Sequence, residues 1–206
     1  MALQLIVQLV SLICAVSAFP TTENSEATFT LHDRASWGAA AATDTRQLAT
    51  PVPYVVLHHT YIPGACNTTL ECAASMRAMQ RYHMGLGWGD IGYNFCVGSD
   101  GAVYEGRGWR HIGIHAGKVN SLSIGICLIG DWRFELPPPQ QLATTRALIS
   151  SLVSRGAVSP RYRLVGHRQA TPTECPGDRL FRELATWEHF EAGDLKTGNM
   201  VNKLTK

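Results

Sequence analysis

One stretch near the C-terminus decides how this chain folds, and it reads Leu164-Val165-Gly166-His167-Arg168-Gln169-Ala170-Thr171-Pro172-Thr173-Glu174-Cys175-Pro176-Gly177. A short apolar run ends at His167, and Cys175 follows eight residues later, before a Pro-Gly pair. Imidazole and thiolate are ligand types that zinc prefers, and the loop between them is long enough to bring both to one ion. The stretch therefore predicts half of a metal site at the end of a β-strand.

A second apolar run supplies the missing half of this site. It reads Tyr54-Val55-Val56-Leu57 and ends in His58-His59. Two strand ends that each deliver a histidine, together with one loop cysteine, give three protein ligands and leave a fourth position for water. A single histidine at a strand end is more often a core or turn residue, so only the combination points to catalytic zinc. The residues alone leave open which of His58 and His59 binds the metal.

Length and charge limit the classes of protein that the chain can belong to. With 206 residues and a formal net charge of +2, it is long enough for one well-buried core and one domain. The weak positive balance gives no reason to expect nucleic acid or an acidic membrane as a partner.

The two ends of the chain differ in composition from the middle. Residues 1–18 are apolar and end in Val16-Ser17-Ala18, which predicts a cleaved secretory signal rather than a membrane anchor, because the run is short and polar residues interrupt it. We expect residues 19–33 to form a flexible leader and residues 191–206 a disordered tail. The mature protein is then secreted, extracellular and free of membrane.

Secretion changes how the cysteines are read, because five remain after the signal is removed. The odd number leaves one thiol for another use, and we assign Cys175 to zinc. Cys66 and Cys72 are six residues apart with a polar turn between them, which predicts a small disulfide loop. Cys96 and Cys127 lie in predicted strands and either pair across the sheet or serve as small buried apolar residues; we favour the second interpretation.

The apolar pattern predicts an α/β fold with one domain over residues 34–190. Strands and helices alternate along the chain, which indicates a central mixed β-sheet flanked by helices on both faces. The expected elements are a strand at 54–60, a helix from Thr69 to the glycines at 85–89, a hairpin at 93–105, a strand at 123–129, a helix between Pro139 and Gly156, a strand at 163–165 and a helix at 178–187.

Several motifs, taken together and in order, resemble the peptidoglycan recognition proteins. The similarity extends from about Arg34 to Phe190 and is greatest to insect secreted members of the long, amidase-type branch. Phage and bacterial type-2 amidases share the domain, although the Cys66/Cys72 loop favours the animal family. The motifs are Val56-Leu57-His58-His59-Thr60, Gly87-Trp88-Gly89-Asp90-Ile91-Gly92-Tyr93, Val103-Tyr104-Glu105-Gly106-Arg107-Gly108-Trp109, His115-Ala116, Gly125-Ile126-Cys127-Leu128-Ile129-Gly130-Asp131-Trp132, and Gly166-His167-Arg168 through Cys175-Pro176-Gly177.

The resemblance implies a zinc-dependent N-acetylmuramoyl-L-alanine amidase, which cuts between the lactyl group of muramic acid and the first L-Ala of the stem peptide. It carries one Zn²⁺ per chain, and the family's ligands fall on His58, His167 and Cys175. The family's catalytic tyrosine falls on Tyr93. Thr173 takes the catalytic position at which phage relatives carry a lysine, which leaves the general base unassigned. Without the resemblance, Tyr93 would be read as strand-edge packing.

The resemblance also implies a groove for glycopeptide. The pair Gly87-Trp88, together with Arg107, resembles the combination that binds diaminopimelate stems, whose extra carboxylate a guanidinium can engage bidentately. The alternative for Arg107 is a solvated charge in a hairpin. The remaining predicted contact positions are His59, Thr60, His83, Tyr93, His115 and Asn120.

We therefore expect a monomeric immune scavenger whose partners are bacterial peptidoglycan and muropeptides, and which dampens signalling by removing stimulatory fragments. A non-catalytic receptor is the rival interpretation, and Cys175 distinguishes the two, because receptors of the family often carry serine there. A directly bactericidal protein is a third. Asn67-Thr68-Thr69 adds a glycosylation sequon inside the Cys66/Cys72 loop.

Overall fold

A computed structural model describes residues 28–195, which form one six-stranded sheet with helices on both sides. The strand order across the sheet is β1-β4-β3-β5-β2-β6. The elements are β1 (Leu31–His32), β2 (Val52–His59), α1 (Thr69–Gly85), β3 (Phe95–Val97), β4 (Val103–Glu105), the 3₁₀ helix η1 (Gly117–Leu122), β5 (Ser123–Leu128), α2 (Pro139–Ser154), β6 (Val158–Gly166), the 3₁₀ turn η2 (His167–Gln169) and α3 (Asp178–Leu184).

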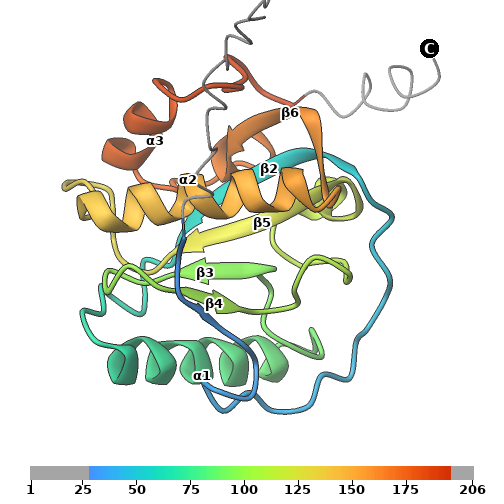
Figure 1. Ribbon diagram of the computed structural model, residues 1–206, viewed down its shortest axis with the longest axis vertical. Helices are drawn as coiled ribbons and strands as arrows, with labels where there is room; N and C mark the ends of the chain where they lie inside the picture. The colour runs from blue at the N-terminus through green and yellow to red at the C-terminus, as the bar shows by residue number, and fades with distance from the viewer. Residues whose placement is uncertain (1–27, 196–206) are drawn as a thin grey trace, which may run out of the picture.

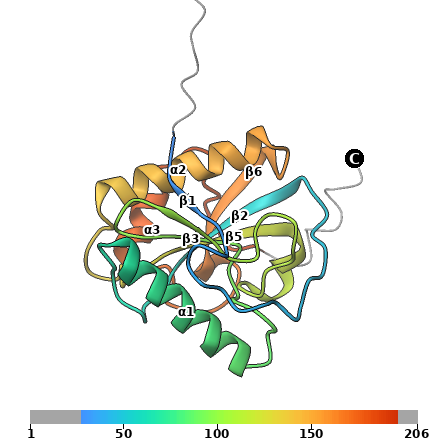
Figure 2. The same ribbon diagram turned by 60° about the horizontal axis from the view of Figure 1, so that its bottom comes forward.

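The sheet is mixed, as the sequence predicts. All neighbouring strands are parallel except the hairpin of β3 and β4. Figures 1 and 2 show α2 and α3 on one face of the sheet and α1 on the other. Parallel strands put their carboxyl ends at one edge, so the residues that follow β2 and β6 meet there.

The side chains of β2 point alternately to the two faces of the sheet, and this alternation determines on which face His58 lies. Val55 and Leu57 belong to the apolar cluster that α2 and α3 cover. Tyr54 and Val56 point to the opposite face and belong to a different cluster. Because side chains alternate along a strand, His58 lies on the same face as Val56, between the part covered by α1 and the part covered by η1.

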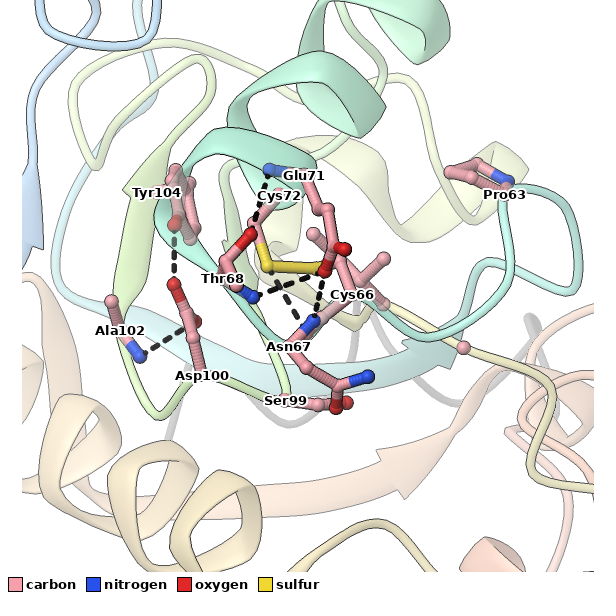
Figure 3. Close-up of a disulfide and its surroundings, with 12 residues drawn as sticks. Pro63, Cys66, Asn67, Thr68, Glu71, Cys72, Ser99, Asp100, Ala102 and Tyr104 are labelled. Atoms are coloured by element: carbon pink, nitrogen blue, oxygen red, sulfur yellow. Dashed lines mark hydrogen bonds between the residues drawn. A yellow bond between two sulfur atoms is a disulfide. The ribbon is translucent and has the colours of Figure 1, made fainter.

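Helix α1 begins at a strong local signal. The Thr68 hydroxyl accepts a hydrogen bond from the Glu71 N–H (3.3 Å), and the Glu71 carboxylate accepts from the Thr68 N–H (3.2 Å), which together form a capping box. The disulfide between Cys66 and Cys72 closes the turn that leads into this helix, as predicted (Figure 3). The exposed Asn67 lies between these groups and donates its main-chain N–H to Glu71.

A second disulfide joins Cys96 and Cys127, so the expectation that these residues are unpaired is wrong. The two cysteines are direct partners in the register of β3 and β5, with Cα atoms 4.5 Å apart. Residues opposite each other in neighbouring strands point to the same face. The sequence shows that both lie in strands, but it does not show which strands are neighbours or how they align.

The predicted leader, 19–33, and the predicted tail, 191–206, are both more ordered than expected where they adjoin the domain. The last part of the 19–33 leader forms β1, which pairs with β4, and His32 stacks on Tyr104 with ring centroids 4.9 Å apart. The first part of the 191–206 tail is also fixed, since the Glu191 main-chain N–H donates to the Leu164 carbonyl and Leu195 is buried. Main-chain pairing at a sheet edge requires no periodic pattern of apolar residues. Polar segments that pair in this way are therefore not predicted from the sequence.

The predicted signal at 1–18 and most of the predicted leader and tail lie outside the described residues. Within residues 28–195, no helix combines the length and the apolar character that a membrane crossing requires.

Candidate metal centre and groove

The three predicted metal ligands come together in the structure. One ligand atom from each of His58, His167 and Cys175 lies within 4.8 Å of the others, and Cys175 Sγ is 3.7 Å from His58 Nδ1. Zinc–ligand bonds of 2.0–2.3 Å in a tetrahedron place a nitrogen and a sulfur about 3.6 Å apart. The donor set and its spacing therefore fit zinc, and His58 rather than His59 is the member of the pair that faces the other ligands.

Each ligand is held by a different kind of segment. His58 sits near the end of β2, with β5 and β6 on either side, and is 1% exposed. His167 follows β6 directly and begins η2. Cys175 comes from the loop between η2 and α3, and the Arg168 N–H donates to its carbonyl oxygen. The sheet therefore fixes one ligand, while the loop fixes another through main-chain hydrogen bonds.

Burial controls the protonation of these ligands. It lowers the pKa of His58 well below its ordinary value and that of His167 to about 4, so both imidazoles are neutral and able to bind metal at neutral pH. Burial also raises the pKa of the Cys175 thiol to about 12, and the His59 N–H, 3.4 Å from the sulfur, partly opposes this shift. A metal that binds here must displace the thiol proton.

The second nitrogen of His58 is also engaged. His58 Nε2 lies 3.0 Å from His115 Nδ1, and the two rings meet edge to face. His115 Nε2 lies 3.5 Å from the Ser123 hydroxyl, which donates to the Val119 carbonyl at 2.7 Å. Both nitrogens of His115 are therefore occupied, so its ring does not present a free nitrogen for the substrate contact that the resemblance implies.

Tyr93 and Thr173 flank the ligands. Tyr93 precedes β3, and its ring centroid lies 5.2 Å from that of His58. Burial raises the pKa of the Tyr93 phenol, which keeps the hydroxyl protonated and able to donate. Thr173 is exposed on the loop, and its hydroxyl oxygen accepts from the Cys175 N–H at 3.2 Å. Within residues 28–195 the Thr173 O–H has no acceptor, so it can donate into the cavity that both residues line.

Two adjoining cavities form the groove. The first, about 480 Å³, is lined by two of the metal ligands, His167 and Cys175, and also by His59 and Thr60. The second, about 660 Å³, extends along α1 past His83. Thr60 and Tyr93 line both cavities, so they mark the junction between the metal centre and the groove. His59 is buried, and its Nδ1 accepts the Trp132 N–H, which leaves Nε2 unassigned.

The far part of the groove is built around His83. Its ring stacks on Trp88 with centroids 4.6 Å apart and planes 17° apart, and its Nδ1 accepts the Gly92 N–H. Burial lowers the pKa of His83 to about 4. Gly87 has φ of 81°, a left-handed conformation that favours glycine, and it turns the chain so that Trp88 lies against His83.

Arg107 is buried, not solvated, so the alternative of an exposed hairpin charge is wrong. A guanidinium has five N–H donors. Ile91, Ile112 and Trp88 each accept one through a main-chain carbonyl, and the Asp44 carboxylate accepts another at 3.1 Å. These contacts leave one N–H for a ligand, whereas the bidentate grip on a carboxylate needs two. The salt bridge to Arg107 also helps to lower the pKa of Asp44, after the larger effect of Arg46.

Asn120 supports the segment that carries His115. Its side-chain oxygen accepts the N–H groups of His115 and Ala116 at 3.0 and 2.7 Å. Its amide nitrogen is the part of the side chain left for the predicted substrate contact.

Sequence reasoning missed three residues of the first cavity, Tyr61, Arg133 and Glu174. The Arg133 guanidinium lies 4.5 Å from the centre of the Tyr61 ring and is paired with Asp131. Tyr61 and Arg133 each directly follow a motif that the sequence singles out, and Glu174 directly precedes Cys175. Their position next to these motifs was the only sequence signal for them.

Comparison with known proteins places the chain in a family. The model of the N-acetylmuramoyl-L-alanine amidase family matches residues 48–178. Peptidoglycan-recognition protein LB of Drosophila melanogaster is 50% identical over 165 residues, which cover 80% of this chain and 71% of that protein.

Solved structures agree with this assignment. A single-residue variant of Drosophila PGRP-LB in complex with tracheal cytotoxin is 48% identical, with a TM-score of 0.78 over 79% of this chain and 96% of that chain. Peptidoglycan recognition protein LE, in complex with the same ligand, described as monomeric diaminopimelic acid-type peptidoglycan, is 41% identical with a TM-score of 0.77 over the same shares. The chain therefore belongs to the peptidoglycan recognition proteins and carries their N-acetylmuramoyl-L-alanine amidase domain.

Proposed function

We propose that the protein is a secreted, zinc-dependent amidase that hydrolyses the bond between the lactyl group of muramic acid and L-Ala in peptidoglycan. The observation that carries this proposal is the convergence of His58, His167 and Cys175. His167 and Cys175 line a cavity that Tyr93 also lines. A receptor that only binds peptidoglycan has no need for a half-buried, unpaired thiol beside two neutral imidazoles.

When bound, zinc lowers the pKa of a coordinated water and polarises the substrate carbonyl. The chain's own residues supply the remaining functions. Tyr93, kept protonated by burial, is a hydrogen-bond donor for the negative charge that develops on the carbonyl oxygen. Thr173 offers a second hydroxyl among the residues that line the cavity. Burial of the ligands excludes bulk water from their inner side, which strengthens the interactions of charges within the site.

The substrate class follows from the groove. Its second cavity combines apolar walls with a few polar groups, which suits a peptide stem. The crystallised relatives bind tracheal cytotoxin, a diaminopimelate-type fragment. Arg107 supports a preference for diaminopimelate stems through its charge and its one uncommitted N–H, and it holds the Trp88 carbonyl at the groove wall.

The cellular setting is part of the same proposal. Two disulfides are typical of proteins that fold in an oxidising compartment, which supports secretion. Cleavage of the lactyl–L-Ala amide separates the stem peptide from the glycan, so the product lacks the features that a muropeptide receptor reads. The protein then acts as a monomeric scavenger that dampens immune signalling.

Metal analysis coupled to mass spectrometry of digested muropeptides tests the proposal. We expect one zinc per chain and release of free stem peptides from diaminopimelate peptidoglycan, with slower release from lysine-type peptidoglycan. A protein that binds muropeptides but yields no free stems with zinc supplied is a receptor, and that result would overturn the proposal.

A further inference from the structure

His115 is a buried imidazole beside the metal ligands that the proposed chemistry does not use. It is 8% exposed, and it lies behind His58 as seen from the cavity, because it contacts the ring nitrogen opposite the one near Cys175. We propose that His115 is a positioning residue, which fixes the tautomer and orientation of His58 so that Nδ1 is available to the metal. This inference rests on the proposed metal site and assigns a specific chain of hydrogen bonds behind it.

The chain of hydrogen bonds has a defined direction. The Val119 carbonyl at its end can only accept, and Ser123 has a single hydroxyl proton. That proton goes to Val119, because the Ser123–Val119 contact is 2.7 Å and the Ser123–His115 contact is 3.5 Å. The Ser123 oxygen is therefore an acceptor for an N–H on His115 Nε2.

The proton position on His115 determines which ring donates in its hydrogen bond with His58. A neutral imidazole carries one proton, so a proton on Nε2 leaves His115 Nδ1 as an acceptor. His58 must donate its Nε2–H across the 3.0 Å contact, which leaves its Nδ1 unprotonated and 3.7 Å from Cys175 Sγ. Metal-bound histidines usually donate their other N–H in this way to a carboxylate or carbonyl. Here the acceptor is a second imidazole.

The fold reserves space for the His115 ring. A Cβ atom added to Gly125 would lie 2.5 Å from the ring, and one added to Gly113 would also lie 2.5 Å from it. The ring is thus enclosed between β5 and the preceding loop. Asn120 fixes the main chain of His115 by accepting its N–H. These contacts hold the ring in one orientation, which a residue that only binds substrate at the surface does not require.

A matched pair of variants separates the hydrogen bond from the packing. In His115→Asn, the side-chain oxygen can occupy the position of the ring Nδ1 and accept from His58, whereas His115→Leu has a similar size and no acceptor. We expect zinc affinity, measured by competition with a chromogenic chelator, to fall roughly tenfold or more in His115→Leu and to be largely retained in His115→Asn. Thermal unfolding of both variants in chelator controls for loss of folding.

Nitrogen NMR of the metal-free parent provides a test that needs neither zinc nor activity. We expect both His58 and His115 to carry their proton on Nε2. A proton on Nδ1 of either ring overturns the inference, as does equal zinc affinity in His115→Leu and the parent. A parent that binds no zinc contradicts the proposed metal site instead, and the NMR result still decides the arrangement of these two rings.

Discussion

The two halves of the metal centre are built in opposite ways. His58 lies in the sheet, with β5 and β6 beside it and His115 behind it. Cys175 lies in a loop whose neighbours Thr173 and Glu174 are exposed. The first half is fixed by strands and hydrogen-bonded side chains. The second is fixed by a few contacts within the loop, such as the Cys175 carbonyl with the Arg168 N–H and the Cys175 N–H with the Thr173 hydroxyl. Such a division gives a rigid base for the ion and a wall of the cavity that can adapt to substrate.

His167 belongs to the adaptable half, although it follows a strand. Its ring lies 4.5 Å from that of His58, and among residues 28–195 its ring nitrogens have no hydrogen-bond partner. Without bound metal, the orientation of His167 is therefore set by packing alone. Substitutions on the sheet side and on the loop side should therefore have different effects on metal binding, stability and turnover.

Removal of the loop ligand gives the largest expected effect. Cys175→Ala leaves two imidazoles, so zinc affinity should fall more than about 100-fold, beyond the loss usual for a supporting residue, and stem-peptide release should be abolished. Binding of muropeptide should persist, because the groove along α1 is untouched. Arg179→Gln, an exposed change on the adjacent helix, serves as control. Cleavage by Cys175→Ala at the parent rate would falsify the metal mechanism.

On the sheet side, we expect the main effect of substitution to be on the free energy of unfolding. The Cys96–Cys127 disulfide closes a separation of 31 residues and lies in register beside His58, since Cys127 pairs with His58 across β2 and β5. From loop closure, its removal by a double alanine substitution should cost about 4 kcal/mol of unfolding free energy. The same change at Cys66 and Cys72, with a separation of 6, should cost about 2 kcal/mol.

Denaturant unfolding of the two double variants measures both costs. The order matters more than the values, because strain and residual structure alter each one. If the shorter loop contributes more than the longer one, β3 and β5 do not stabilise the site in the way that we infer.

Loss of one hydroxyl should lower turnover and leave the metal in place. Tyr93→Phe keeps the ring that packs near His58 and removes the donor, so kcat should fall about 100-fold, as for other oxyanion donors. Zinc content and KM should change little. A fall in zinc affinity of the same size would show that Tyr93 supports the ligands rather than the reaction.

The comparison of the two halves also explains what the sequence could predict. The pair His58-His59 and the single His167 are recognisable because each ends an apolar run, which is a local signal. Cys175 is recognisable because the number of cysteines is odd after signal removal, and the resemblance then selects His58 from its pair. The Cys96–Cys127 bond depends on which strands become neighbours, a property of the whole sheet.

The contact between His58 and His115 joins residues 57 positions apart and requires space left by glycines, so no local pattern shows it. The resemblance identified His115 as part of the site and assigned it to the substrate. The ends of the domain, β1 and residues 191–195, are polar segments fixed by main-chain bonds, which composition does not reveal.

The smallest expected effect is on the pH dependence of folding stability. It concerns His83, in the part of the groove along α1. Burial, with the charge of Arg107, lowers the pKa of His83 from its ordinary value of 6.5 to about 4. A histidine whose pKa is lowered in the folded state contributes stability above pH 6.5, and this stability is lost as the pH falls toward 4. His83→Asn keeps an acceptor for the Gly92 N–H but does not titrate.

Relative to His83→Asn, the parent should therefore lose stability as the pH falls from 6.5 to 4, by about 1 kcal/mol once partial exposure of the ring is taken into account. Urea unfolding of both proteins across this range measures the difference. The other buried imidazoles titrate equally in parent and variant, so they cancel. Parallel curves would mean that His83 is solvated in the folded protein, and the groove along α1 would then belong with the adaptable loop rather than with the sheet.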